Sequence, residues 1–122
     1  MAAWMEGILR REYSLRRNKE FRYVYKKGKS VSDGNLVLIY VITKTPRLKV
    51  GFSVSKKLGN SVERNRIKRR LKEAFFSMIG EVSPKSLLVF VPRDHAKNLS
   101  YHELKASQER LLKKAGLMGQ AV

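Results

Sequence analysis

The sequence predicts a single α+β domain, with a small mixed β-sheet and three helices packed as two layers. Three observations support this class. The chain has 122 residues, a length that suits one compact domain. Hydrophobic residues make up 43% of it, which is enough for a folded core. Helical and strand-like segments follow the order α-β-β-(β)-α-β-α, where the bracketed strand is left open by the pattern.

The first predicted element is a short helix at about residues 19–27. Asn18 offers an N-cap, Glu20 places an acid in the first turn, and Gly28 follows two lysines as a stop signal. Phe21, Val24 and Tyr25 recur at i, i+3 and i+4, so they share one face. Residues 1–13 are expected to form a basic N-terminal arm, with the domain spanning 14–116 and a tail at 117–122.

Two strands are predicted next. Residues 30–35 are turn-rich, with Asp33-Gly34 as the strongest turn signal. The segments 36–43 and 48–54 are rich in β-branched or alternating apolar residues and are separated by a short polar stretch that contains Pro46. Together they predict an antiparallel hairpin with one face more exposed than the other.

The longest predicted helix covers residues 62–78, with Asn60 or Ser61 as its cap. Its apolar residues recur at helical spacing: Ile67, Leu71, Ala74, Phe75 and Met78. Residues 86–91 then form a buried strand that ends at Pro92. A capping-box pattern at Ser100 and Glu103 opens a last helix, which runs through Leu104, Leu111 and Leu112 towards Gly116.

Charge is the outlying property of the composition. There are 27 Lys and Arg against 10 Asp and Glu, a formal net charge of +17. Such an excess favours a polyanionic partner, with nucleic acid ahead of an anionic membrane surface. The uncharged, strand-length run at residues 36–43 is far shorter than the roughly 20 residues of a membrane span. The chain has no cysteine and no signal-peptide pattern at its start, so we expect a cytoplasmic protein without disulfides.

The basic residues concentrate before and within the longest helix. Residues 56–72 contain eight basic residues and one acid, Glu63. Because the apolar stripe faces the sheet, the cations fan over the solvent side, where exposed helical faces usually mix both signs. A helix N-terminus also attracts anions through its free N–H groups. We therefore favour nucleic acid binding over a merely solvated face. The candidate contacts are the basic residues Lys56, Lys57, Arg64, Arg66, Lys68, Arg69 and Arg70.

A second constellation surrounds the first helix. Phe21 and Tyr25 are flanked by the cations Arg16, Arg17, Arg22, Lys26, Lys27 and Lys29. Aromatic rings among cations can hold single-stranded RNA, because rings stack on unpaired bases and cations follow the backbone. From the spacing alone, packing of this aromatic stripe into the core is the simpler interpretation.

No active site is evident in the sequence. The histidines, His95 and His102, are best interpreted as surface residues, and Asp94 with His95 is too small a set to predict a metal site. Walker and dinucleotide-binding glycine motifs are missing, as are paired carboxylates suited to acid–base catalysis. We expect no catalytic residue and no protein-bound metal or cofactor. A protein-only nuclease would instead require one of the histidines.

Two blocks of the sequence resemble the bacterial ribonuclease P protein subunit. The first is GFSVSKKLGNSVERNRIKRRLKEAF at residues 51–75, and the second is LRRNKEF at residues 15–21 with Val24, Tyr25 and Gly28. The resemblance covers about residues 15–112, and the arm before it has no counterpart.

Membership of this family would imply a small protein that joins a catalytic RNA to remove the 5′ leader of precursor tRNA. The RNA would carry out the reaction with magnesium ions. The basic helix would contact the RNA subunit, and the resemblance assigns this role to Arg64, Asn65, Arg66, Lys68, Arg69 and Arg70, with Lys56 and Lys57 beside them. A cleft between the first helix and the sheet would receive the leader. This reverses the preference for core packing of Phe21 and Tyr25, and the leader set becomes Phe21, Tyr25, Arg16, Arg17, Arg22 and Lys29.

The resemblance also implies a left-handed βαβ crossover through the basic helix, against the usual right-handed rule. Asp33-Gly34-Asn35 departs from the more basic or bulkier residues expected at this loop, which puts its share in leader contact in question. The alternative function is a ribosomal or general RNA-binding protein with no role in processing.

Overall fold

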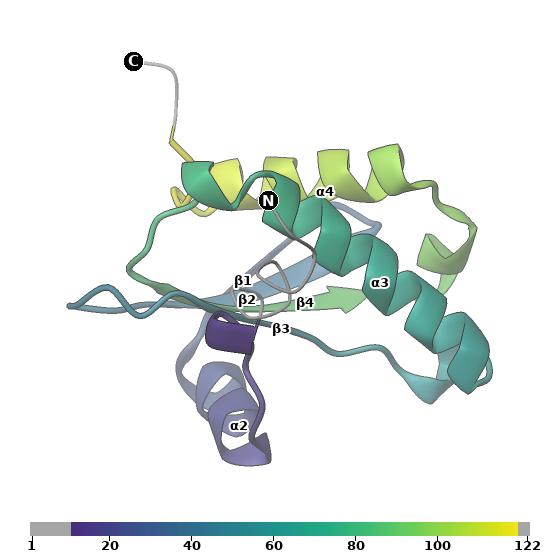
Figure 1. The fold of residues 1–122 in the computed structure, drawn as a ribbon, viewed down its shortest axis with the longest axis horizontal. Coiled ribbons are helices and arrows are strands. Elements are labelled where there is room, and N and C mark those ends of the chain that lie inside the picture. Colours follow the sequence, from purple (N-terminus) through teal and green to yellow (C-terminus); the bar gives the residue numbers. More distant parts are fainter. Residues whose placement is uncertain (1–10, 120–122) are drawn as a thin grey trace.

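The computed structural model describes residues 11–119 and contains a four-stranded mixed sheet with helices on both faces (Figure 1). The strands are β1 (Lys29–Ser32), β2 (Leu36–Ile42), β3 (Lys49–Phe52) and β4 (Ser86–Pro92). The α-helices are α2 (Asn18–Lys27), α3 (Ser61–Ser77) and α4 (Tyr101–Lys114), with 3₁₀ turns η1 (Lys56–Leu58), η2 (Ile79–Glu81) and η3 (Asp94–Asn98). The α+β class, the mixed sheet and the three helices are confirmed.

The strand order across the sheet is β1-β2-β4-β3. β2 pairs antiparallel with both β1 and β4, whereas β3 pairs parallel with β4. The predicted hairpin of residues 36–43 and 48–54 is therefore wrong, because β4 lies between these two segments. β4 is apolar on both faces, and a central position buries both of them, whereas a hairpin of β2 with β3 would leave β4 at an edge.

The strand that the sequence did not reveal is β1. It has only one strongly apolar residue, Val31, and its four residues lie at the edge of the sheet, partly in solvent. The turn to β2 contains Gly34 with φ of +94°, and the Asp33 carboxylate accepts hydrogen bonds from the N–H groups of Asn35 and Leu36 at 3.0 and 3.1 Å. The turn signal was correct, but it joins β1 to β2.

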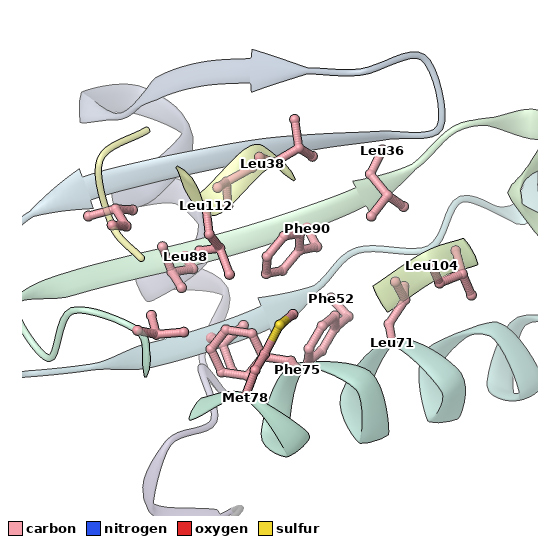
Figure 2. Packing of buried hydrophobic residues seen from close by; sticks show 14 of the residues in the cluster. Leu36, Leu38, Phe52, Leu71, Phe75, Met78, Leu88, Phe90, Leu104 and Leu112 are labelled. Carbon is pink, nitrogen blue, oxygen red and sulfur yellow. The ribbon is translucent and has the colours of Figure 1, made fainter. Parts of the chain in front are cut away.

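The main core lies between the sheet and the helices α3 and α4 (Figure 2). Phe75 of α3 contacts the rings of Phe52 and Phe90, with ring centroids 6.4 and 5.9 Å away. The apolar stripe predicted for α3 is confirmed, since all five of its members are buried: Ile67, Leu71, Ala74, Phe75 and Met78. The stripe fixes which side of α3 is left to solvent.

A second cluster fills the opposite face of the sheet. Val24 of α2 is fully buried there against Leu87 and Val89 of β4, and Phe21 packs on the same cluster. Figure 1 shows α2 on one side of the sheet and both α3 and α4 on the other. The expected two-layer arrangement holds for the sheet with α3 and α4, and α2 forms an additional layer on the opposite face, because β4 presents apolar side chains to both faces.

Helix ends follow the predicted signals with one exception. Asn60 caps α3 by accepting a hydrogen bond from the Glu63 N–H at 2.9 Å, and Ser100 with Glu103 forms the predicted capping box of α4. Asn18, in contrast, is the first residue of α2, and the N-cap is Arg17, which makes no side-chain capping bond.

Across residues 11–119, no helix combines the length and apolar character needed to cross a membrane.

The chain after α4 packs against the segment between η2 and β4. Leu117 and Met118 are buried, the Ser83 N–H donates to the Leu117 carbonyl at 2.6 Å, and Met118 forms an isolated bridge with Val82. Residues 1–10 of the expected arm and 120–122 of the expected tail lie outside the described residues.

Candidate nucleic-acid interface

The loop before α3 places two lysines beside the start of the basic helix. Leu58 is 1% exposed and anchors η1 in the core, while Lys56 and Lys57 remain exposed. Gly59 has φ of +132°, and a Cβ there would lie 2.8 Å from the Glu63 carboxylate. Glycine is therefore required by both conformation and space, and the tight loop holds both lysines next to the N-terminal turn of α3.

On α3 itself, the predicted RNA-binding residues divide by exposure. Asn65, Arg66 and Arg69 are exposed, whereas Arg64, Lys68 and Arg70 are half-buried. Arg70 donates from Nη1 to the Leu99 carbonyl at 3.2 Å, so it also ties α3 to the segment before α4. The basic set therefore wraps around the helix on both sides of the buried stripe.

These cations are not neutralised within the described part of the chain. The two salt bridges found among residues 11–119 are Arg110 with Asp33 at 2.9 Å and Lys113 with Glu109 at 3.1 Å. Both involve α4, and neither involves α2, η1 or α3. The surface around α3 thus keeps a concentrated positive field, which attracts a polyanion and strengthens its binding at low salt.

A cleft of about 670 Å³ separates α2 from α3 at the end of β3. It is lined by Asn18, Phe21, Arg22, Tyr25, Phe52, Ser53, Val54 and Lys68. Tyr25 is 44% exposed, so most of its ring does not belong to the core. The cleft combines aromatic rings with two cations, which are the groups that hold a single strand of nucleic acid.

Phe21 has a divided role in this cleft. A Cβ on Gly51 would lie 2.5 Å from both Cε1 and Cζ of Phe21, so the ring occupies the space above this glycine on β3. Phe21 is half-buried against the second core cluster and also lines the cleft. The interpretation from spacing alone is that this face of α2 packs into the core. It holds fully for Val24, partly for Phe21 and least for Tyr25.

The structure does not bring every predicted leader-binding residue into the cleft. Arg16 and Arg17 line a separate hollow of about 510 Å³ together with Arg11, Glu12, Ser14, Glu20 and Lys49. Lys29 is exposed at the start of β1 and does not line the cleft. Lys68, predicted among the contacts to the RNA subunit, lines the cleft instead of lying apart from it.

Sequence reasoning did not single out four cleft residues: Asn18, Phe52, Ser53 and Val54. The signal that could have identified three of them is the position of residues 52–54 directly after β3 and before the lysine loop. The residues at this strand end therefore line the mouth of the cleft.

The Asp33 loop is occupied by structural contacts to α4. Asp33 accepts hydrogen bonds from Ser107 and from Arg110, whose Nη2 lies 2.9 Å away. Burial raises the pKa of the Asp33 carboxyl, but the hydrogen bonds from Ser107, from the Leu36 N–H and from Arg110 outweigh it and hold the pKa below its usual value. This aspartate therefore serves as an anchor between the β1–β2 turn and α4.

Both histidines are exposed, as predicted. His95 of η3 lies 2.7 Å from the Asn35 side-chain oxygen through Nε2, while the ring of His102 packs edge-on against Tyr101 of α4. Among residues 11–119, no group of three or more His, Asp or Glu side chains is arranged to hold a metal ion. The described residues of the site offer cations, aromatic rings and side-chain amides, which suit binding of nucleic acid.

Comparison with known proteins identifies the family. The model of the ribonuclease P family matches residues 9–116. The ribonuclease P protein component of Shouchella clausii is 40% identical over 112 residues, covering 90% of this chain and 91% of that protein. The Clostridium novyi protein of the same name is 43% identical over 112 residues, covering 89% and 98%.

A solved structure agrees with the sequence relatives. The RNase P protein of Staphylococcus aureus superimposes with a TM-score of 0.79 at 33% identity, covering 88% of this chain and 98% of that one. The chain therefore belongs to the ribonuclease P protein family.

Proposed function

We propose that this chain is the protein subunit of ribonuclease P, which binds a catalytic RNA through α3 and the 5′ leader of precursor tRNA in the cleft beside α2. Family membership supports a role in a ribonuclease complex. The single observation that supports separate binding sites for the RNA subunit and the leader is the cleft itself, which is lined by the rings of Phe21 and Tyr25 and by Lys68 of α3.

In this proposal the protein contributes binding, and the RNA subunit with its magnesium ions contributes the chemistry. The exposed side chains of Asn65, Arg66 and Arg69 would contact RNA phosphates, with Lys56 and Lys57 beside them. Arginine suits this position because its planar guanidinium donates two hydrogen bonds to one phosphate. The protein would lower the electrostatic cost of bringing substrate and RNA subunit together, most of all where magnesium is scarce.

Reconstitution tests the overall assignment. The purified protein alone should cleave nothing, and adding it to the RNA subunit should increase cleavage of precursor tRNA at low magnesium. Cleavage by the protein without RNA would contradict the proposal. The alternative, a general RNA-binding protein, predicts co-purification with ribosomal RNA in place of one structured RNA of a few hundred nucleotides.

The cleft has a matched control within α2. Tyr25 and Tyr23 are 44% and 49% exposed, but only Tyr25 lines the cleft. Tyr25→Ala should weaken the holoenzyme's binding of precursor tRNA by on the order of tenfold, the value of one stacked base, while binding of mature tRNA stays unchanged. Tyr23→Ala should change neither. If the two substitutions had equal effects, the leader would not bind in this cleft and the proposal would fail.

Salt dependence tests the helix. Arg66→Ala should weaken binding of the RNA subunit and lower the slope of log affinity against log salt by roughly 0.7 to 0.9, which corresponds to one phosphate contact. Arg66 is exposed and makes no salt bridge among the described residues, so its loss should leave folding intact. An unchanged affinity and slope would exclude Arg66 from the interface.

A further inference from the structure

Another hollow lies on the other flank of α3, away from the cleft beside α2 that we propose for the leader, called the leader cleft below. It is a groove of about 250 Å³ between α3 and η3, lined by Glu63, Arg66, Ile67, Arg70, Lys97 and Asn98. The leader cleft is lined by Lys68 of the same helix, and the two hollows share no residue. The groove is therefore a separate surface, although it borders the proposed RNA-binding side chains.

The groove carries three cations against one acid. Arg66 and Lys97 are exposed and take part in no salt bridge among residues 11–119. The acid, Glu63, folds back over Gly59: its Oε2 lies 2.8 Å from the position that a Cβ on residue 59 would occupy. The single carboxylate of the groove therefore lies against the loop before α3. The three cations outnumber it, so the groove suits one anionic group.

The η3 wall of the groove is held from several sides. Ala96 is fully buried, and His95 lies 2.7 Å from the Asn35 side-chain oxygen through Nε2. The Leu99 carbonyl accepts a hydrogen bond from Arg70 at 3.2 Å, and Ser100 directly after it caps α4. Lys97 and Asn98 therefore project from an ordered segment, which lowers the entropy lost when they bind a ligand.

We propose that this groove binds a backbone phosphate of the RNA subunit, with Lys97 and Asn98 as contacts in addition to those of α3. The Arg66 guanidinium and the Lys97 ammonium would neutralise the phosphate, and the Asn98 amide would donate a hydrogen bond to it. This inference rests on the proposed function. The RNA subunit is favoured over the precursor tRNA leader because the groove and the leader cleft lie on opposite flanks of α3.

The test compares Lys97→Ala with Lys44→Ala, another exposed lysine, which lies in the loop between β2 and β3 and far from the groove in sequence. Binding of the isolated RNA subunit is measured over a range of salt. We expect Lys97→Ala to weaken binding roughly threefold to fivefold and to lower the salt slope by about 0.7 to 0.9, with Lys44→Ala at the wild-type value. Lys97→Arg should retain both, and Asn98→Ala should weaken binding with an unchanged slope.

The outcomes separate this inference from the proposed function. If Arg66→Ala weakens binding of the RNA subunit but Lys97→Ala does not, the groove assignment is overturned and the proposed function stands. If Lys97→Ala affects only precursor tRNA binding by the assembled holoenzyme, the phosphate belongs to the substrate and the assignment to the RNA subunit fails. If the wild-type protein does not bind the RNA subunit, both proposals fail together.

Discussion

Replacing Gly51 by alanine should disturb the leader cleft through one defined contact. The new Cβ would lie 2.5 Å from Cε1 and Cζ of Phe21 and 3.2 Å from the Cβ of Leu15. Carbon atoms pack best about 3.5 to 4.0 Å apart, so the ring must move by about 1 Å or more. The strand cannot retreat, because Gly51 is buried and β3 is paired with β4. The ring is therefore the group that moves.

The expected cost of Gly51→Ala is about 1 to 3 kcal/mol of unfolding free energy, the usual range for an extra methyl group in a packed site. Urea unfolding followed by circular dichroism measures it. Because the displaced ring also lines the cleft, affinity for precursor tRNA should fall while affinity for mature tRNA is kept. Tyr23→Ala, which alters an exposed ring outside the cleft, provides the control.

A double-mutant cycle decides whether Phe21 transmits the effect. In a Phe21→Ala background the clash is gone, so adding Gly51→Ala should cost far less than it does in the wild type, with a coupling on the order of 1 kcal/mol. Additive costs would refute the reasoning, since they would mean that Gly51→Ala acts through β3 itself. Full leader binding by the single variant would refute it as well.

Three further predictions concern the supports of the site. The pKa of Asp33 is lowered in the folded state, so the ionised carboxylate stabilises the fold above pH about 4, and this contribution is lost as pH falls through the folded pKa. The free energy of unfolding of Asp33→Asn should therefore fall less than that of the wild type between pH 7 and pH 3, and an equal fall would contradict this. Phe75→Ala should cost about 3 to 5 kcal/mol in urea unfolding, because the fully buried ring leaves a cavity beside Phe90; a cost below 1 kcal/mol would show that the core closes around it. Asn60→Ala should cost about 1 kcal/mol through the lost cap of α3, with Ser61→Ala as the neutral control.

The site could be predicted only in part before the structure was known. The basic side of α3 followed from the sequence, because the apolar stripe of Ile67, Leu71 and Phe75 fixes by helical geometry which side chains face solvent. The cleft required the fold: Phe21 and Tyr25 on α2 meet Lys68 on α3 only because the end of β3 lies between the two helices. Arg16 and Arg17 are close to Phe21 in sequence but line a different hollow.

The sequence by itself determined the helices, the caps of α3 and α4 and the distribution of charge, because these depend on residues within a few positions of one another. The capping box of Ser100 and Glu103 and the cap at Asn60 are local contacts of this kind. Only the tertiary structure decided the strand order, the edge strand β1 and the placement of α2 on the second face of the sheet. The physical reason is that a strand's partners are chosen by which pairing buries the most apolar surface in the whole chain. For β4, the apolar run indicates a buried strand, but no local pattern encodes that its neighbours are β2 and β3.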